Sequence, residues 1–248
     1  MNAIDFAVRA GRSYIQWAQP ISYLVRRLVK MCANLSGNSF VGGRCLDIGA
    51  GIAPYRAHIE RHFGIDHYIE LDFASSDKTN LIADASHLPL HTEAIDLVVC
   101  FDVLQHIPDY WASLDEVVRV LRPGGALVFT VPFVYCEVGP HDYHRWTLEG
   151  IESELRARGL NVLISLTRGG AFFALTSIGV WAAQHLVPGQ RRYWRSDRTI
   201  LSILRGVVTI ILTLPMLLLA WLGLGIDSVL PKSGLYMGVS VFARKSDS

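Results

Sequence analysis

The stretch Cys45-Leu46-Asp47-Ile48-Gly49-Ala50-Gly51-Ile52-Ala53-Pro54-Tyr55 decides the fold. The apolar run Arg44–Ile48 predicts a strand that enters a tight turn at Gly49 and Gly51. Glycine lets the backbone approach a ligand closely, and Pro54 predicts the start of a helix, because proline is tolerated where a backbone N–H has no partner. The free N–H groups at such a start favour an anionic group. The stretch therefore predicts a strand–turn–helix unit that binds a ligand.

Short apolar strands and helical stretches alternate after this turn. Apolar residues recur at helical spacing from Leu114 to Leu121, and Pro123-Gly124-Gly125 is expected to end that helix. A second helix is predicted at Leu148–Arg158, with Thr147 as its N-cap. This alternation favours an α/β fold with a mostly parallel sheet covered on both faces. The further strands are predicted at Tyr68–Leu71, Leu81–Ile82, Asp96–Phe101, Ala126–Val131, Leu160–Leu166 and Leu235–Ala243.

The composition narrows the class of protein and of partner. A chain of 248 residues fits one α/β domain with an appendage. Charged residues make up 18% of the chain, below the roughly 25% of an ordinary soluble domain, so an apolar segment is expected. The net charge of +1 argues against a nucleic-acid partner, which calls for a basic surface. The cysteines lack paired or metal-ligand spacing, so we expect no disulfide framework and no metal; they are Cys32, Cys45, Cys100 and Cys136.

Acidic residues lie at or just after the ends of three predicted strands: Asp47, Asp72 and Asp84. Because the carboxyl ends of parallel strands meet at one edge, we expect these side chains to converge on one crevice. Each aspartate alone would more often cap a helix or a turn. A dinucleotide-binding loop would carry a third glycine where this chain has Pro54, which argues against an NAD-linked enzyme. Glu70 lies within a strand that should be buried, and the sequence offers no account of it.

These motifs, in this order, resemble the class I S-adenosylmethionine-dependent methyltransferases. The first motif of that family has the Asp-x-Gly-x-Gly form found here at Asp47–Gly51. The resemblance covers about Gly42–Leu166 and a final strand. It implies a Rossmann-like, mostly parallel sheet with an antiparallel seventh strand, and S-adenosyl-L-methionine as the cofactor. The other motifs are Tyr68–Asp72, Ala83–Leu90, Asp96–Ile107 and Leu121–Gly125.

The resemblance also implies a role for each motif. The turn Asp47–Gly51 lies around the methionine portion of the cofactor, where an acid suits an amino group. Asp72 holds the ribose hydroxyls, since a carboxylate accepts two hydrogen bonds from a diol. Asp84 accepts a hydrogen bond from the adenine amino group, and Ala85 supplies a backbone N–H. The residues expected to bind the cofactor are Asp47, Gly49, Ala50, Gly51, Asp72, Phe73, Asp84, Ala85 and Phe101.

The loop Gly139–Thr147 carries a second cluster of polar and aromatic side chains. It resembles the HDY-x-R-x-T signature of a type 11-like methyltransferase branch often encoded near glycan or cell-envelope pathways, and it should overhang the transferred methyl group. His141 and His144 are candidate general bases, because histidine titrates near neutral pH. Asp142 would orient one of their rings, and Arg145 would bind an anionic group on the acceptor. Alternatively, His141 and Arg145 tie the loop to the next helix.

Two segments point to a membrane. Residues 1–36 hold five basic residues and one acidic residue, which favours helices on a membrane surface or, equally, a helical cap on the domain. The apolar segment 171–233 lies between the last two predicted strands, so its ends must lie close together. It would span the membrane twice, pack against itself or a partner chain, or enter one face only, with Pro215 breaking the longer helix into a re-entrant hairpin. The one-face arrangement is preferred, because it keeps the arginines of 191–198 near cytoplasmic headgroups.

The sequence therefore predicts an N-terminal helical segment at 1–41, a methyltransferase domain at 42–170 plus 234–245, and a membrane-associated insertion at 171–233. We expect methyl transfer at the cytoplasmic face of a membrane, to a small-molecule or lipid-linked acceptor such as a lipid-linked glycan, a quinone or another lipid. The methylated atom is left open among oxygen, carbon and nitrogen. The alternatives are a non-catalytic membrane-anchored scaffold that retains the fold and, less favoured, an NAD-linked oxidoreductase.

Overall fold

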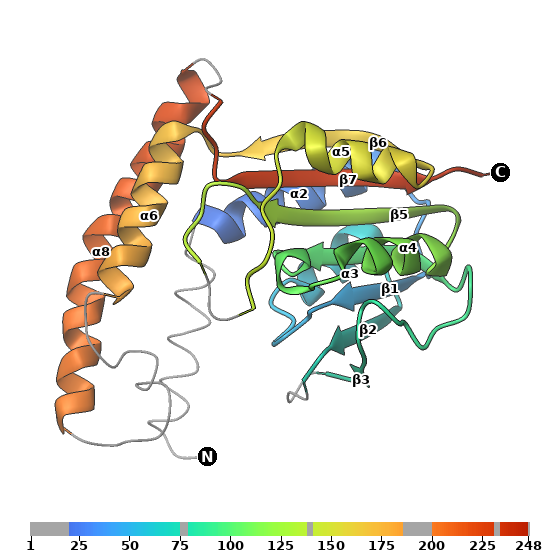
Figure 1. Cartoon of the computed structure of the whole chain (residues 1–248), viewed down its shortest axis with the longest axis horizontal. Helices are drawn as coiled ribbons and strands as arrows, with labels where there is room; N and C mark the ends of the chain where they lie inside the picture. Colours follow the sequence, from blue (N-terminus) through green and yellow to red (C-terminus); the bar gives the residue numbers. More distant parts are fainter. Residues whose placement is uncertain (1–19, 75–78, 138–140, 186–199, 231–233, 248) are drawn as a thin grey trace. The chain divides into compact units, whose positions relative to one another are not determined.

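The chain divides into a sheet unit and a helical unit, drawn in Figure 1. The computed structural model describes residues 20–74, 79–137, 141–185, 200–230 and 234–247. The sheet unit comprises residues 1–133, 138–168 and 238–248. The helical unit comprises residues 134–137 and 169–237.

The sheet unit is built on seven strands in the order β3-β2-β1-β4-β5-β7-β6. Neighbouring strands from β3 to β5 pair in parallel, whereas β7 is antiparallel to both β5 and β6. The predicted Rossmann-like sheet with an antiparallel seventh strand is thereby confirmed. The strands are β1 (Arg44–Ile48), β2 (His67–Asp72), β3 (Leu81–Ile82), β4 (Ile95–Phe101), β5 (Leu121–Pro132), β6 (Leu160–Arg168) and β7 (Gly238–Lys245).

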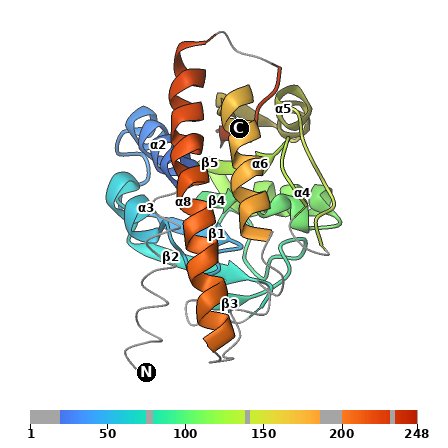
Figure 2. The same ribbon diagram turned by 90° about the vertical axis from the view of Figure 1, so that its left-hand side faces the viewer.

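Helices cover both faces of this sheet, with α2 and α3 on one face and α4 and α5 on the other (Figure 1 and Figure 2). Thr147 caps α5, because its Oγ1 accepts a hydrogen bond from the amide of Gly150 at 3.1 Å. The predicted start of this helix is therefore confirmed. The helical elements of the sheet unit are α2 (Pro20–Ser36), α3 (Arg56–Phe63), the 3-10 helix η1 (Leu104–His106), α4 (Tyr110–Val120) and α5 (Leu148–Ala157).

Several boundaries differ from the prediction, and the two largest shifts are at the starts of β5 and β7. The helix α4 ends at Val120 and β5 begins at the next residue, so Pro123-Gly124-Gly125 lies in the strand and does not end the helix. The last strand begins at Gly238, later than predicted. The residues before it pair elsewhere, since the carbonyl of Tyr236 accepts a hydrogen bond from the amide of Val134 within the helical unit. Both shifts depend on contacts that local sequence does not encode.

The helix α2 packs on the core of the sheet unit. Its residues Val25 and Val29 are buried in one apolar cluster with Phe63 of α3 and residues of the central strands. Of the two alternatives for the N-terminal segment, the structure shows the packed helix for residues 20–36. The remainder of that segment, 1–19, lies outside the described residues.

Glu70 is buried in β2, where it is 1% exposed. Its Oε1 accepts a hydrogen bond from Arg56 Nη1 of α3 at 2.5 Å, and its Oε2 accepts one from Asn80 Nδ2 at 2.7 Å. A buried carboxylate is tolerated when it is paired and hydrogen-bonded in this way. Glu70 therefore joins α3 and the segment before β3 to β2. The sequence could not show this role, because its partners lie 14 and 10 residues away.

The helical unit is a pair of neighbouring helices, α6 (Ala171–His185) and α8 (Ile200–Val229), seen side by side in Figure 1 and Figure 2. Asp227, near the end of α8, accepts hydrogen bonds from the amides of Gly170 and Phe173, each at 2.8 Å. A carboxylate that accepts from the first amides of a helix satisfies donors that have no partner within the helix. Asp227 thus caps α6 from the neighbouring helix, and the two helices run in opposite directions.

The predicted break at Pro215 is wrong, because α8 continues through this residue from Ile200 to Val229. A proline inside a helix removes one hydrogen bond and crowds the preceding turn, a local cost of about 3 kcal/mol. The other hydrogen bonds of a 30-residue helix and its packing along α6 offset that cost. Among the helices in the described part of the chain, none combines the length and the apolar character needed to cross a membrane.

The segment 169–237 leaves the sheet unit after β6 and rejoins it at β7. Arg168, the last residue of β6, pairs with Gly238, the first residue of β7. The two ends of the segment therefore lie next to each other, as the sequence predicts. Gly238 also pairs with Pro132, so the segment departs from the edge of the sheet at which β5 ends.

Candidate active site

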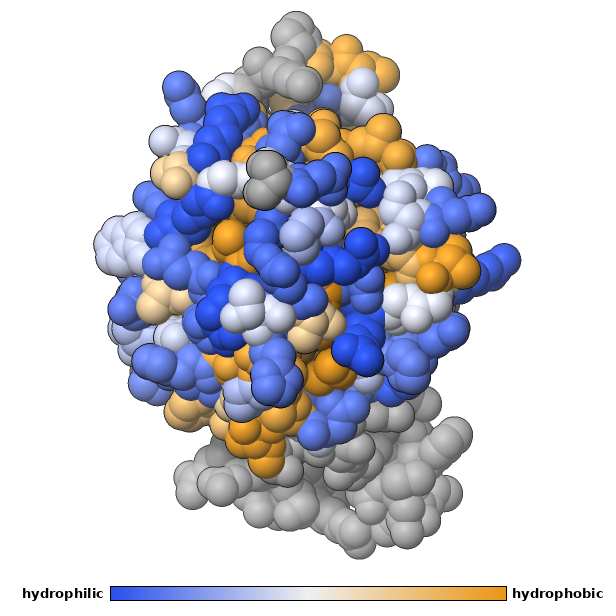
Figure 3. All heavy atoms as spheres, turned by 90° about the vertical axis from the view of Figure 1, so that its right-hand side faces the viewer, coloured by the Kyte–Doolittle hydropathy of each residue, from blue (hydrophilic) through white to orange (hydrophobic). Residues whose placement is uncertain are grey.

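The candidate site lies at the carboxyl edge of the parallel strands. The strands β1 and β2 pair with Ile48 opposite Leu71, so Gly49 and Asp72 emerge next to each other. The strand order runs in opposite directions on the two sides of β1, through β2 on one side and β4 on the other. Ligands of open α/β sheets bind at such a switch point, outside the carboxyl ends. The opposite edge of the sheet, which faces the viewer in Figure 3, presents mostly hydrophilic residues.

Gly49 and Gly51 serve the turn in different ways. Both adopt left-handed backbone conformations, with φ of 70° and 54°. A Cβ added at Gly49 would lie 2.3 Å from the side chain of Val103, whereas a Cβ added at Gly51 would meet nothing within 4 Å. Gly49 is therefore required by packing, and Gly51 borders open space that a ligand can enter.

The end of β2 holds this turn in place. The amides of Gly49 and Ala50 both donate to the carbonyl of Leu71, at 2.8 and 3.0 Å. The amide of Gly51 donates to Asp72 Oδ2 at 2.9 Å. Ala50 is buried and Asp72 is partly exposed. The predicted ribose acid is thus hydrogen-bonded to the predicted methionine turn.

The helix after the turn begins later than predicted, so the expectation for Pro54 is wrong. The first residue of α3 is Arg56, and Tyr55 occupies the N-cap position. Ala53 adopts a φ of 48°, and its amide donates to the carbonyl of Ala50 at 2.7 Å. The chain therefore makes a second tight turn, which separates the glycines from the helix.

Asp47 is a buried acid, with 5% of its surface exposed. Its Oδ2 accepts a hydrogen bond from the hydroxyl of Tyr68 at 2.7 Å. Burial raises the pKa of Asp47 to about 7; the charges of Glu70 and Asp72 also raise this pKa, while the Tyr68 hydrogen bond lowers it. Such an acid gains most from a cationic partner, which stabilises its charged form. This environment suits an amino group.

Of the other predicted cofactor residues, two are open to solvent and two are packed. The side chain of Asp84 is 52% exposed, and its Oδ1 accepts a hydrogen bond from a neighbouring amide at 2.8 Å. Phe73 is 80% exposed. Ala85 is buried, and Phe101 meets Tyr55 edge-on, with 5.3 Å between ring centroids. Asp84 and Phe73 therefore present surface that a ligand can cover.

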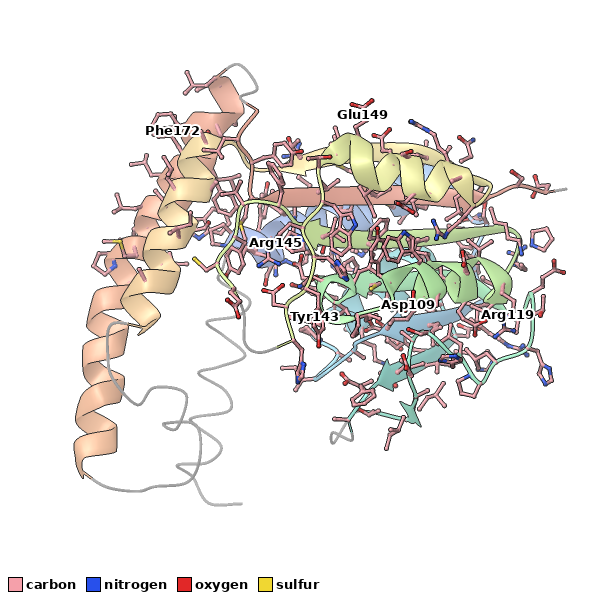
Figure 4. The ribbon with its side chains drawn as sticks, in the orientation of Figure 1. Asp109, Arg119, Tyr143, Arg145, Glu149 and Phe172 are labelled. Carbon is pink, nitrogen blue, oxygen red and sulfur yellow. The ribbon has the colours of Figure 1, made fainter. Side chains whose placement is uncertain are left out.

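The acceptor loop, residues 141–147, joins β5 to α5 and rests on η1; Figure 4 labels Tyr143 and Arg145 on it. The amide of Tyr143 donates to the carbonyl of Gln105 at 2.8 Å. The Nδ1 atom of His106 lies 2.6 Å from the carbonyl oxygen of His141. These contacts attach the loop to the segment that follows β4.

Asp142 does not orient a histidine ring, contrary to the prediction. Its Oδ1 contacts Nη1 of Arg145, and its Oδ2 lies 2.8 Å from Nη2 of the same side chain. The side chain of Asp142 is 1% exposed. A carboxylate buried to this degree needs both oxygens paired, and a bidentate guanidinium achieves this better than an imidazole. A role for Arg145 toward an anionic acceptor group stays a prediction.

The two candidate bases have different surroundings. The Nε2 atom of His144 lies 3.1 Å from the carbonyl oxygen of Pro108, and its ring packs edge-on against Tyr110 at 4.8 Å. His141 is exposed, and its Nδ1 lies 3.0 Å from the hydroxyl of Tyr143. His141 is therefore the candidate base that faces solvent.

The sequence did not single out Asp102 and Arg168, which form an ion pair at this edge. Asp102 directly follows β4, and Arg168 is the one charged residue of β6. That lone charge was visible, but its partner lies 66 residues away. Within the described ranges, no group of three or more His, Cys, Asp or Glu side chains is placed to hold a metal ion.

Residues 46–129, which include the glycine turn and all three acids, match the family described as methyltransferase domain. This segment resembles a methyltransferase domain. The chain is similar to a ubiquinone biosynthesis O-methyltransferase of Xanthomonas oryzae, 27% identical over 105 residues, 35% of this chain and 41% of the relative. It is also similar to a malonyl-[acyl-carrier protein] O-methyltransferase of Yersinia pestis, 31% identical over 132 residues, 49% of this chain and 47% of the relative. The chain thus spans less than half the length of these curated relatives.

Among solved structures, the chain is similar to phosphoethanolamine N-methyltransferase 2 of Haemonchus contortus in complex with phosphomonomethylethanolamine and S-adenosylhomocysteine. The TM-score is 0.52, the sequence identity is 17%, and the match covers 86% of this chain and 51% of that chain. This likeness concerns the fold, which agrees with the methyltransferase topology of the sheet unit.

Proposed function

We propose that this protein is an S-adenosylmethionine-dependent methyltransferase that acts on a small-molecule acceptor. The observation that carries the proposal is the glycine turn flanked by Asp47 and Asp72, inside a segment that matches a methyltransferase domain. The two curated relatives reported above are O-methyltransferases by name, which agrees with this class of reaction.

The residues around the turn fit S-adenosyl-L-methionine, which supplies a methyl group on a positively charged sulfur. Asp47, as a buried acid, would bind the amino group of the cofactor, and Gly51 leaves the open space that its methionine portion needs. Asp72 would accept hydrogen bonds from the ribose hydroxyls. The exposed Phe73 and Asp84 would cover the adenine, with Asp84 accepting a hydrogen bond from its amino group.

The acceptor loop has to align the acceptor and, where the accepting atom is a hydroxyl oxygen, to remove its proton. We assign the removal of this proton to His141, because its side chain is exposed, whereas the ring of His144 contacts the carbonyl of Pro108. Tyr143 contacts Nδ1 of His141 and would hold the ring in place. Asp142 takes no part in the proton transfer, because Arg145 occupies its carboxylate.

The proposed acceptor is amphiphilic and membrane-linked, such as a quinone, a lipid-linked glycan or another lipid. The helical unit supports this choice, because large apolar side chains are exposed on it: Leu175, Leu218, Leu222 and Val229 are 59%, 70%, 59% and 81% exposed. The connection 191–198 holds four arginines, which suit anionic headgroups. The name of the Xanthomonas oryzae relative also points to a quinone pathway. We therefore propose that 171–233 associates with the cytoplasmic face of a membrane, and that 42–170 and 234–245 form the catalytic domain.

The function is tested with purified full-length protein, methyl-labelled S-adenosylmethionine and a membrane lipid extract. We expect label in the organic phase, and an Asp72→Ala variant that transfers at least about tenfold less, because the ribose loses its charged partner. Label found only in water-soluble products would contradict the amphiphilic acceptor. A protein that neither transfers label nor binds S-adenosylhomocysteine would be the non-catalytic scaffold, and binding of NADH instead would indicate the oxidoreductase.

Membrane association is tested by flotation with vesicles of phosphatidylcholine and phosphatidylglycerol. We expect the full chain to float with the vesicles and the double variant Leu218→Asp, Leu222→Asp to remain at the bottom of the gradient. A matched control, Leu163→Asp, changes an exposed leucine of β6 and should float like the wild type. Equal flotation of all three proteins would overturn the proposed role of the helical unit.

A further inference from the structure

Asp102, the residue that follows β4, is held at every polar group. Its φ of 55° lies in the left-handed region that side chains rarely adopt. Its amide donates to the carbonyl of Thr130 at 3.0 Å, and its own carbonyl accepts a hydrogen bond from Gln105 Nε2 at 2.7 Å. Its carboxylate is paired with Arg168. A strained residue that its surroundings over-determine is a mark of functional sites.

Arg168 reaches Asp102 across two strands, since β7 and β5 lie between β6 and β4. Its Nη1 lies 2.6 Å from Asp102 Oδ2 and its Nη2 lies 2.5 Å from Oδ1, so the pair is bidentate. The same Nη2 donates to the carbonyl of Val131 at 3.1 Å. The path is open because residue 238 is glycine: an added Cβ would lie 2.5 Å from both Arg168 Nη2 and Val131 O. Arg168 therefore ties β6 and β5 to the residue after β4.

Buried polar atoms without a hydrogen-bond partner gather around the same residue. Within the described part of the chain they include Nε of Arg168, Oε1 of Gln105 and Oγ1 of Thr130. Each of these residues also contacts Asp102. A core shaped for stability alone avoids such atoms, because an unpaired buried donor or acceptor is costly. Their concentration at Asp102 favours a functional reason for the arrangement.

Hydrogen bonds through Gln105 connect Asp102 to the acceptor loop. Gln105 donates to the carbonyl of Asp102, and the carbonyl of Gln105 in turn accepts the amide of Tyr143. We infer that Arg168 is a positioning residue, which holds the acceptor loop at 141–147 through Asp102 and η1. This inference rests on the proposed function, because the loop is assigned there to the acceptor.

Residue-resolved amide exchange, measured by NMR on the full chain, tests this connection. In Arg168→Gln we expect the amide of Tyr143 to exchange at least about tenfold faster. The amide of Trp146 donates to the carbonyl of Pro132 at 3.1 Å, independently of Asp102, and should change less than about twofold. Equal acceleration of both amides, or of neither, would overturn the inference.

A matched control comes from the other end of β4. Arg122 pairs with Asp96 there, and Arg122→Gln should leave the exchange of Tyr143 unchanged. If Arg168→Gln does not fold, Asp102→Asn retains the size of the side chain and tolerates a left-handed backbone. The same selective acceleration of Tyr143 is expected from it.

Cofactor affinity and turnover are measured separately from amide exchange. In Arg168→Gln we expect the affinity for S-adenosylhomocysteine to stay within about threefold of wild type, because Arg168 makes its hydrogen bonds to Asp102 and Val131 and not to the glycine turn. Turnover with labelled cofactor and the membrane lipid extract should fall about tenfold or more, since a displaced loop misaligns the acceptor. Unchanged turnover would overturn the inference. A wild-type protein that does not bind S-adenosylhomocysteine would contradict the proposed function and would leave the exchange result standing.

Discussion

The acids on the cofactor side and the acid of the acceptor loop are held by different partners. Asp72 accepts hydrogen bonds from the amides of Gly51 and Ala74, one on each oxygen, Asp84 accepts one from a neighbouring amide, and both stay partly or largely exposed. Asp142 is 1% exposed, and Arg145 occupies both of its oxygens. A carboxylate oxygen that accepts from one amide keeps a lone pair for a ligand, whereas a buried carboxylate bound by a bidentate guanidinium keeps few.

This difference distinguishes aspartates that can bind a ligand from an aspartate that stabilises a loop. An aspartate can bind a ligand only if the fold leaves lone pairs on its carboxylate unused. By this criterion Asp72 and Asp84 belong to the binding surface, and the pair of Asp142 and Arg145 gives the acceptor loop its shape. Substitutions on the two sides should therefore affect different quantities.

The largest effect on stability is expected at Asp142. Asp142→Ala removes the carboxylate that pairs with the guanidinium of Arg145, and we expect the free energy of unfolding to fall by about 3 kcal/mol, as for a broken buried pair. Chemical denaturation measures this change. Arg156→Gln breaks an exposed pair with Glu152 and should cost no more than about 0.5 kcal/mol. A loss below about 1 kcal/mol in Asp142→Ala would mean that this acid is not structural.

The two glycines of the turn should separate stability from binding. Gly51→Ala places a methyl group in open space, so we expect an affinity for S-adenosylhomocysteine about 100-fold lower, with only the 1–2 kcal/mol loss of stability that a left-handed alanine brings. Gly49→Ala collides with Val103 and should lose about 2 kcal/mol or more. Calorimetric titration and denaturation measure both variants. Binding by Gly51→Ala at wild-type affinity would show that no ligand enters this space.

A smaller, pH-dependent effect is expected at Asp47. Because burial raises its pKa from 3.8 to about 7, the folded state holds the proton more tightly than the unfolded state. The free energy of unfolding should therefore fall as pH rises from about 4 to about 7, and Asp47→Asn should lack this part of the fall. Urea denaturation at several pH values measures the difference between the two proteins. Identical pH profiles would contradict the buried, proton-holding Asp47.

Ionised Asp47 should also attract the amino group of the ligand. We expect S-adenosylhomocysteine to bind about tenfold more tightly at pH 8 than at pH 6, a dependence that Asp47→Asn should remove. If the variant keeps the same dependence, another group is responsible.

The parts of the fold that local signals decide could be predicted from the sequence. The strand β1 and the short β3 were predictable to the residue, and Thr147 marked the start of α5. The helix start after the glycine turn could not be predicted, because it depends on the second turn at Ala53. The break predicted at Pro215 does not occur, because α8 packs along α6 and this packing compensates for the lost hydrogen bond.

Some residues of the candidate site could likewise be predicted from the sequence, and others could not. Asp47 and Asp72 could be placed from sequence, because the ends of parallel strands must meet at one edge. The partner of Asp142 could not be predicted from sequence, because two histidines and Arg145 all lie within three residues of it. Only the burial of the carboxylate selects the guanidinium. The ion pair of Asp102 with Arg168 depends on a path over two strands that the sequence does not reveal.

Titration of the full chain with S-adenosylhomocysteine tests the central claim most directly, namely that the acids at the carboxyl edge hold this cofactor. We expect one molecule bound per chain and an affinity roughly tenfold lower in Asp72→Asn, which loses the charge proposed to hold the ribose hydroxyls. Asp66→Asn, which changes an exposed aspartate just before the start of β2, should bind like the wild type. Absence of binding by the wild type, or equal binding by all three proteins, would contradict the account.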